Sequence, residues 1–165
     1  MLDYQKIAAD YVSQMLHKDG LCSKYVALAC RRQLNDLMRE GDKDFPYIYE
    51  PSKGARVCTF VEQLPHIKGK LAGEPIKLEP WQVFILMTVF SWVHKDTGYR
   101  RFRRTYIEVP RGNGKSAISS AIGLYMLCAD GEGGAEVYSF ATTRDQAKIV
   151  FGDAQQMARR TSGLR

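Results

Sequence analysis

A short segment near the middle of the chain carries residue types that bind phosphate. Residues 109–116 read Val-Pro-Arg-Gly-Asn-Gly-Lys-Ser. In a loop of this kind, backbone N–H groups of the glycine turn surround phosphate oxygens, the lysine neutralises the terminal phosphates, and the following hydroxyl binds Mg²⁺. Gly114, Lys115 and Ser116 occur in the order that these three roles require.

This motif depends on the elements on either side of it. A phosphate-binding loop follows a strand and opens a helix, because the helix N-terminus adds partial positive charge near the phosphate. Residues 105–109 are rich in β-branched and aromatic side chains, and residues 115–128 have a helical pattern. One departure stands out, since the usual glycine five residues before Gly114 is Val109 here. The alternative is a plain strand-to-helix glycine turn with an exposed lysine; the flanking elements and Arg111 favour phosphate binding.

Hydrophobic periodicity predicts helices through most of the chain before this loop. Apolar residues recur at three- and four-residue steps, which places them on one helical face. Ser23 is placed to cap a helix that Gly41 ends, and Pro80 takes a favourable first-turn position. The expected helices are residues 4–16, 24–40, 52–64, 81–93, 115–128 and 143–160, and the expected strands are 105–109 and 136–141.

The order strand, loop, helix, strand, helix in the second half defines the expected fold class. It is α/β: the start of a P-loop NTPase parallel sheet (βαβα), preceded by a helical N-terminal region. We expect a helical region over residues 1–50 and the N-terminal portion of an ATPase domain over 51–165. Two strands do not complete a sheet of this type.

Composition and charge narrow the class of protein. The chain has 165 residues, 45% of them hydrophobic, which suffices for the core of one domain. Lysine and arginine number 24 against 18 acidic residues, a balance that suits a polyanionic partner. No run approaches the ~20 apolar residues of a membrane span, and no secretory signal is visible. The four cysteines form no Cys-x-x-Cys pair, which favours reduced thiols over a zinc or redox site.

Two further segments extend the pattern around the loop. Residues 69–82, ending in Glu-Pro-Trp-Gln, precede it, and residues 134–147, containing Ala-Thr-Thr-Arg-Asp-Gln-Ala, follow it. Together with the arginine-bearing loop at 109–116, they resemble the large subunits of tailed-phage DNA-packaging terminases, particularly the HK97-like group. The resemblance covers about residues 55–160 in an ordered series of motifs, whereas residues 1–50 match only in being helical.

The resemblance implies an activity, cofactors and partners. Terminase large subunits are P-loop ATPases that use ATP and Mg²⁺ to thread double-stranded DNA through a portal into a procapsid. The implied partners are double-stranded DNA, the portal protein, the small terminase subunit and other copies of the large subunit. The implied location is the host cytoplasm, with no membrane association. The family also has a C-terminal nuclease domain, an RNase H-like fold with clustered acidic residues, which we do not expect within these 165 residues.

The resemblance also assigns roles to individual residues. Lys115 would bind the γ-phosphate and Arg111 would be a second cation at the phosphates, both serving catalysis. Ser116 would bind the magnesium. An aromatic-glutamine pair, Trp81 and Gln82, would lie near the nucleotide base, with Gln82 contacting the adenine. The expected nucleotide-binding set is Trp81, Gln82, Gly112, Asn113, Gly114, Lys115, Ser116 and Ala117.

Two other functions stay open from the sequence. The chain could be a truncated or split fragment that binds nucleotide or DNA without turnover, or a helicase-like P-loop ATPase, which shares the early motifs. P-loop ATPases place an Asp at the end of an apolar strand to hold magnesium, usually beside a Glu that activates water. This sequence has no adjacent pair of acidic residues. We therefore expect binding of ATP by the chain alone without efficient hydrolysis.

A basic run precedes the first expected strand. Arg100, Arg101, Arg103 and Arg104 flank Phe102, a pattern that suits contact with a DNA backbone. A solvated edge protected by charge is the other interpretation.

Overall fold

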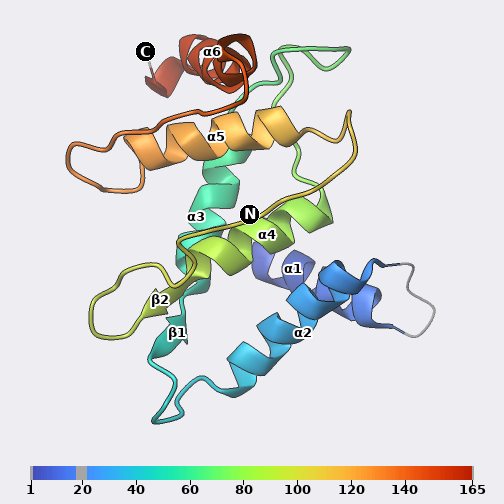
Figure 1. The fold of residues 1–165 in the computed structure, drawn as a ribbon, viewed down its shortest axis with the longest axis vertical. Helices are drawn as coiled ribbons and strands as arrows, with labels where there is room; N and C mark the ends of the chain where they lie inside the picture. Colours follow the sequence, from blue (N-terminus) through green and yellow to red (C-terminus); the bar gives the residue numbers. More distant parts are fainter. Residues whose placement is uncertain (1, 18–21, 165) are drawn as a thin grey trace. The chain divides into compact units, whose positions relative to one another are not determined.

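The computed structural model describes residues 2–17 and 22–164 and contains both helices and strands (Figure 1). It divides into two compact units. The first unit comprises residues 1–58 and 78–106, and the second comprises residues 59–77 and 107–165. None of the described helices combines the length and apolarity that crossing a membrane requires.

Two amphipathic helices open the first unit where the periodicity predicts them. Helix α1 spans Tyr4–Leu16 and helix α2 spans Lys24–Met38. Asp3 caps α1 by accepting a hydrogen bond of 2.9 Å from the Lys6 backbone N–H. Ser23 caps α2 in the same way, as expected from the sequence. The helix predicted over residues 4–16 and the cap predicted at Ser23 are confirmed, whereas α2 ends at Met38, two residues before the predicted end.

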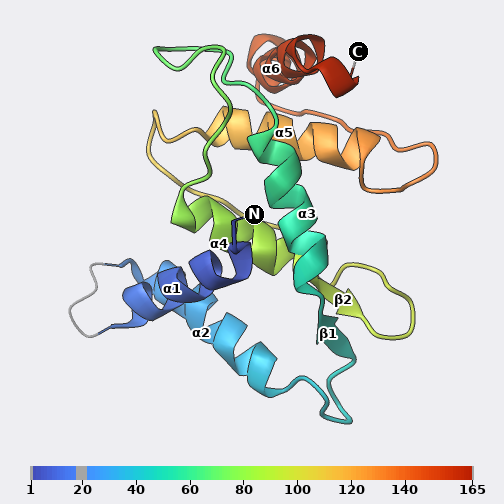
Figure 2. The ribbon, with the colours of Figure 1, turned by 180° about the vertical axis from the view of Figure 1, so that it is seen from behind.

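Helix α4 (Pro80–Ser91) forms the centre of this unit. Its residues are apolar almost all round, which is typical of a helix enclosed by others. Figure 2 shows α1 lying against α4, with α2 beside α1. Helix α3 (Pro51–Glu62) approaches α4 at Gly54, where a β-carbon would lie 2.9 Å from the Met87 Cα atom. Helix α3 begins at Pro51 and ends at Glu62, one residue before the predicted start and two before the predicted end; proline suits a first helical position.

A short antiparallel pair of strands completes the first unit. Strand β1 (Tyr47–Tyr49) pairs with strand β2 (Trp92–His94), and Ile48 lies opposite Val93. The predicted helix over residues 81–93 was therefore too long, because α4 ends at Ser91 and Trp92 begins a strand. The indole N–H of the fully buried Trp92 donates to Gln33 Oε1 at 2.9 Å, a bond that fixes this departure from the helix.

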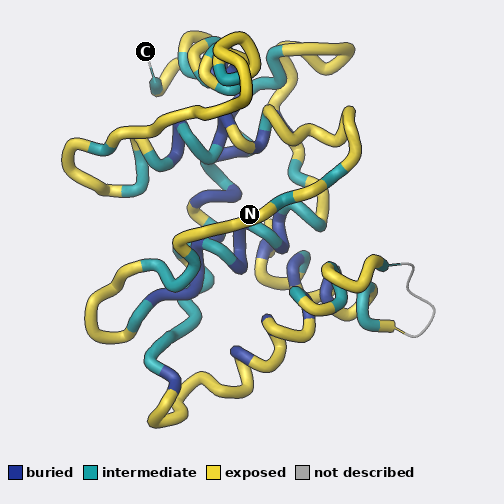
Figure 3. Tube along the Cα trace, in the orientation of Figure 1, coloured by how far each residue is buried: buried dark blue, intermediate teal, exposed yellow. Residues whose placement is uncertain are grey.

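The second unit contains two long helices in contact with each other. Helix α5 spans Lys115–Cys128 and helix α6 spans Arg144–Arg160, followed by a 3-10 turn, η1, at Ser162–Leu164. The bounds agree with the predicted helices, and Thr143 caps α6. Figure 3 shows that buried positions recur along α5, whereas the segment between α5 and α6 is largely exposed.

The two strands predicted in the second half are not formed. Residues 105–109 and 136–141 are not assigned to strands, and the described residues form one sheet, the antiparallel pair β1–β2. A parallel strand requires hydrogen-bonded neighbours and cover on its faces. Tyr106 and Phe140 are 86% and 87% exposed, so these segments lack such cover among the described residues. The fold is mixed helix and strand, and the domain boundary expected near residue 50 stays a prediction.

Candidate phosphate-binding site

The loop at residues 109–116, called the glycine loop below, uses its glycines where the backbone requires them. Gly112 has a φ of 87° and Gly114 a φ of 72°, values in the left-handed region that other residues rarely adopt. Among the described residues, no side-chain-bearing residue has a positive φ. Val109 therefore occupies its position without backbone strain. Valine can therefore stand in place of the usual glycine at position 109, because the backbone needs no left-handed conformation there.

Lys115 folds back over this loop. Its Nζ atom donates a hydrogen bond of 2.6 Å to the carbonyl oxygen of Val109. The Asn113 side-chain amide donates to the Pro110 carbonyl oxygen at 3.2 Å. Both acceptors are backbone atoms, which any residue supplies, so the closed shape does not depend on a glycine at position 109. The lysine ammonium therefore lies against the loop, next to the place where a phosphate would bind.

The glycine loop ends at the N-terminus of α5. Gly114 is the N-cap, and within the described residues no side chain bonds the cap. The first turn of α5, described in full, contains no acidic residue. Its backbone N–H groups carry the partial positive charge of the helix dipole. Residues 111–116 are exposed. The second unit thus presents Arg111, Lys115 and a helix N-terminus on one accessible loop.

The two residues expected near a nucleotide base lie in the first unit, in the first turn of α4. Gln82 forms a capping box there: its Oε1 accepts a 2.9 Å hydrogen bond from the Glu79 backbone N–H, and the Glu79 side chain accepts from the Gln82 backbone. The sequence signal was an acidic residue three positions before a glutamine at the start of an apolar run. Trp81 is half-buried. The structure gives Gln82 a capping role, and its role toward a base stays a prediction.

The basic run before the glycine loop divides into residues of two kinds. Arg101 forms an ion pair with Asp36 at 2.7 Å, and its guanidinium carbon lies 4.9 Å from the centre of the Tyr47 ring. Arg103 and Arg104 are exposed. Arg101 is therefore part of the packing of the first unit, a role that the sequence did not reveal because Asp36 is distant along the chain.

The comparisons with known proteins identify the family to which the chain belongs. Residues 80–164, more than half of the chain, match the family model of the terminase large subunit, ATPase domain. The chain belongs to this family, and the resemblance noted from the sequence is confirmed. The matched region contains the whole glycine loop, α5 and α6.

A curated relative shows how much of such a protein is present. The chain is 29% identical over 108 residues to the terminase large subunit of Enterobacteria phage HK97. The matched region is 64% of this chain and 20% of the phage protein. The chain therefore spans about one fifth of the length of this relative. No solved structure matches it.

Proposed function

We propose that this chain is the ATP-binding portion of a terminase large subunit, with the glycine loop acting as its P-loop. The observation that carries the proposal is the closed loop geometry. Gly112 and Gly114 take left-handed conformations, and Lys115 Nζ lies 2.6 Å from the Val109 carbonyl oxygen at the start of α5. Membership of the family supports ATP as the ligand.

The residues present fit a magnesium-bound triphosphate. Phosphate oxygens need N–H donors and cations, which the exposed amides of residues 112–116, Lys115 and Arg111 supply. The Ser116 hydroxyl is an oxygen ligand of the kind that Mg²⁺ prefers. Bound magnesium neutralises charge on the phosphates. Gln82 and Trp81 are proposed to contact the base, by resemblance.

The chemistry of these residues divides into binding and orientation. Lys115 would leave the Val109 carbonyl oxygen for the terminal phosphate, where its charge is better compensated. Arg111 would add a second positive charge at the phosphates. Gly112, Asn113 and Ala117 would contribute backbone amides, with Asn113 also keeping the loop closed through Pro110.

In the longer protein, this module would couple ATP hydrolysis to packaging of double-stranded DNA. We propose double-stranded DNA, a portal protein, a small terminase subunit and further copies of the large subunit as partners inside the host cell. The family match supports this assignment, and the formal charge of +6 suits a DNA partner.

A second candidate function is nucleotide binding without turnover. The sequence has no adjacent pair of acidic residues to hold magnesium and activate water. We expect the isolated chain to bind ATP and to hydrolyse it at the background rate, since general-base assistance alone is worth ~10²–10⁴-fold. A phosphate-release assay checks this. Turnover at a rate typical of motors, abolished by Lys115→Ala, would identify a missed carboxylate, and Glu108 would be examined first.

A competition experiment tests the phosphate-binding assignment. A fluorescent ATP analogue is bound to the chain with Mg²⁺ and displaced by ATP, by AMP or by inorganic tripolyphosphate. We expect tripolyphosphate to compete and AMP to compete at least tenfold more weakly than ATP, because the loop binds the terminal phosphates. Displacement by AMP and ATP at equal concentrations would contradict the assignment.

A further inference from the structure

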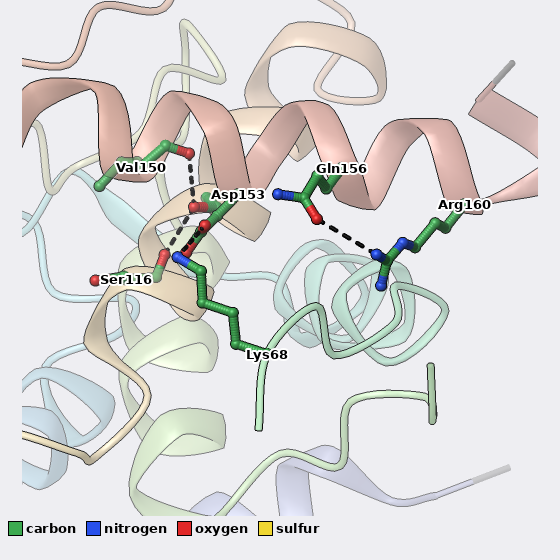
Figure 4. A network of polar contacts seen from close by, with 7 residues as sticks. Lys68, Ser116, Val150, Asp153, Gln156 and Arg160 are labelled. Carbon is green, nitrogen blue, oxygen red and sulfur yellow. Dashed lines mark hydrogen bonds and ion pairs between the residues drawn. The ribbon is translucent and has the colours of Figure 1, made fainter. Parts of the chain in front are cut away.

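A buried hydroxyl links the first turn of α5 to α6. The Ser120 hydroxyl donates to two backbone carbonyl oxygens, one from Ser116 and one from Val150, two residues that Figure 4 labels. Both distances are 2.8 Å. Ser120 is 1% exposed, so water does not compete for these bonds. The residue four positions before Ser120 is the one whose hydroxyl is proposed to bind magnesium.

The two contacts of Ser120 are different in kind. The bond to Ser116 follows the usual pattern of a helical serine, which donates to the carbonyl four residues earlier. The bond to Val150 crosses to another helix. A hydroxyl has one proton to donate, so the two carbonyl oxygens share it. The first turn of α5 is therefore tied to the backbone of α6 at the level of Ser116.

Helix α6 is itself fixed within the second unit. Asp153, one turn after Val150, is 5% exposed and pairs with Lys68 Nζ at 2.6 Å (Figure 4). Met157, one turn further, is fully buried. Thr143 caps the N-terminus of the helix, and Arg159 and Arg160 suit its C-terminal dipole. Helix α6 therefore gives Ser120 a stable support.

We propose that Ser120 is a positioning residue that sets the place of Ser116 for magnesium. This inference rests on the proposed ATP-binding function. Ser120 would not touch the nucleotide. Its hydroxyl holds the carbonyl of Ser116 and thereby orients the Ser116 side chain, while Lys115 and the loop amides reach the phosphates without its help. Loss of the hydroxyl should therefore weaken the magnesium-dependent part of nucleotide binding.

The test measures the affinity for a fluorescent ATP analogue in Mg²⁺ and again in a chelator. For Ser120→Ala we expect a loss of ~3- to 10-fold in Mg²⁺, the effect of one buried hydrogen bond, and a change below about twofold in chelator. Ser119→Ala is the matched control, because Ser119 lies on the same helix and is exposed. It should change neither affinity by more than about twofold.

The other outcomes separate this inference from the proposed function. Equal losses of affinity with and without Mg²⁺ would show general loosening of the unit and would overturn the positioning role, as would values matching Ser119→Ala. Lys115→Ala is measured in parallel. If it leaves affinity unchanged, the proposed function fails, whatever Ser120 does. Circular dichroism establishes folding, and if Ser120→Ala were unfolded, Ser120→Cys, which keeps a weak donor, would undergo the same comparison with a smaller expected loss.

Discussion

The first unit and the glycine loop of the second unit hold their polar side chains in different ways. The first unit encloses polar partners as well as apolar ones, as the bonds of Trp92 to Gln33 and of Arg101 to Asp36 show. The glycine loop of the second unit is exposed, and the hydrogen bonds of Lys115 to Val109 and of Asn113 to Pro110 use backbone carbonyl oxygens a few residues away.

We therefore expect substitutions in the first unit to act mainly on stability and substitutions in the glycine loop to act mainly on ligand binding. In the first unit, a side chain is held by partners distant along the chain, so replacing one partner should change the free energy of unfolding. In the second unit, the glycine loop is shaped by contacts within a few residues, as in Lys115 to Val109. Substitutions there should change ligand affinity more than stability.

The largest effect is expected at the buried ion pair of the first unit. Arg101→Ala leaves the Asp36 carboxylate, 7% exposed, without its cation. We expect a loss of ~3–5 kcal/mol in the free energy of unfolding, as for other broken buried pairs. Both tryptophans, Trp81 and Trp92, lie in the first unit, so urea unfolding followed by their fluorescence reports on this unit. Exposed Arg103→Ala is the control, within about 0.5 kcal/mol of wild type. Equal stabilities of the two variants would contradict the packing role of Arg101.

Alanine substitutions at two helical glycines, Gly54 in the first unit and Gly152 in the second, should change stability in opposite directions. Gly54→Ala in α3 places a β-carbon 2.9 Å from the Met87 Cα and Sδ atoms, and we expect a loss of ~1–3 kcal/mol from overpacking. Gly152→Ala in α6 meets no atom within 4 Å and should stabilise its helix by ~0.5–1 kcal/mol. Tryptophan fluorescence follows the first variant and circular dichroism the second. A stabilised Gly54→Ala variant would refute the close α3–α4 contact.

DNA binding, where present, should depend on the exposed arginines. We expect it to be independent of sequence and to weaken with salt, because arginines of this kind contact phosphates. Replacing Arg103 and Arg104 by alanine should reduce the slope of log affinity against log salt by ~0.9 for each DNA phosphate that these arginines neutralise. Fluorescence anisotropy with duplexes of different sequence measures this. A slope unchanged in the double variant would show that these arginines do not contact DNA.

The smallest effect concerns a thiol in the core of the first unit. Burial, and secondarily the nearby Cys22, raises the pKa of Cys30 to about 11. The folded state favours the neutral thiol, so its contribution to stability is present below the ordinary pKa of 9.0 and is lost as the pH rises toward 11. At pH 8, iodoacetamide should modify the exposed Cys128 and leave Cys30 unmodified in the folded chain. Peptide mass spectrometry distinguishes the two sites, and equal modification would contradict the burial of Cys30.

The sequence predicted the local features well and the distant contacts poorly. Helices α1, α5 and α6 followed from periodicity and caps, because those signals lie within a few residues. The end of α4 was missed, since Trp92 leaves the helix to pair with β1 and to bond Gln33, which no local pattern reveals. The strands expected at 105–109 and 136–141 had suitable composition, but a strand also requires neighbours.

The candidate site shows the same limit. The order of Gly114, Lys115 and Ser116 was sufficient to locate the loop, although Val109 stands where glycine is usual. The structure shows that its carbonyl oxygen is the atom in contact with the lysine, so its side chain matters less. Ser120 carried no sequence signal. Its proposed positioning role follows from its hydrogen bond to the carbonyl oxygen of Val150, thirty residues away along the chain.

The central claim is that Lys115 binds the terminal phosphates of ATP. Titration of a fluorescent ATP analogue into wild type, Lys115→Ala and Lys148→Ala tests it most directly, because Lys148 is an exposed lysine of the same unit. We expect Lys115→Ala to lower the affinity by more than about tenfold, the effect of removing a charge-assisted hydrogen bond, and Lys148→Ala to resemble wild type. Equal dissociation constants for all three proteins would contradict the assignment of the glycine loop.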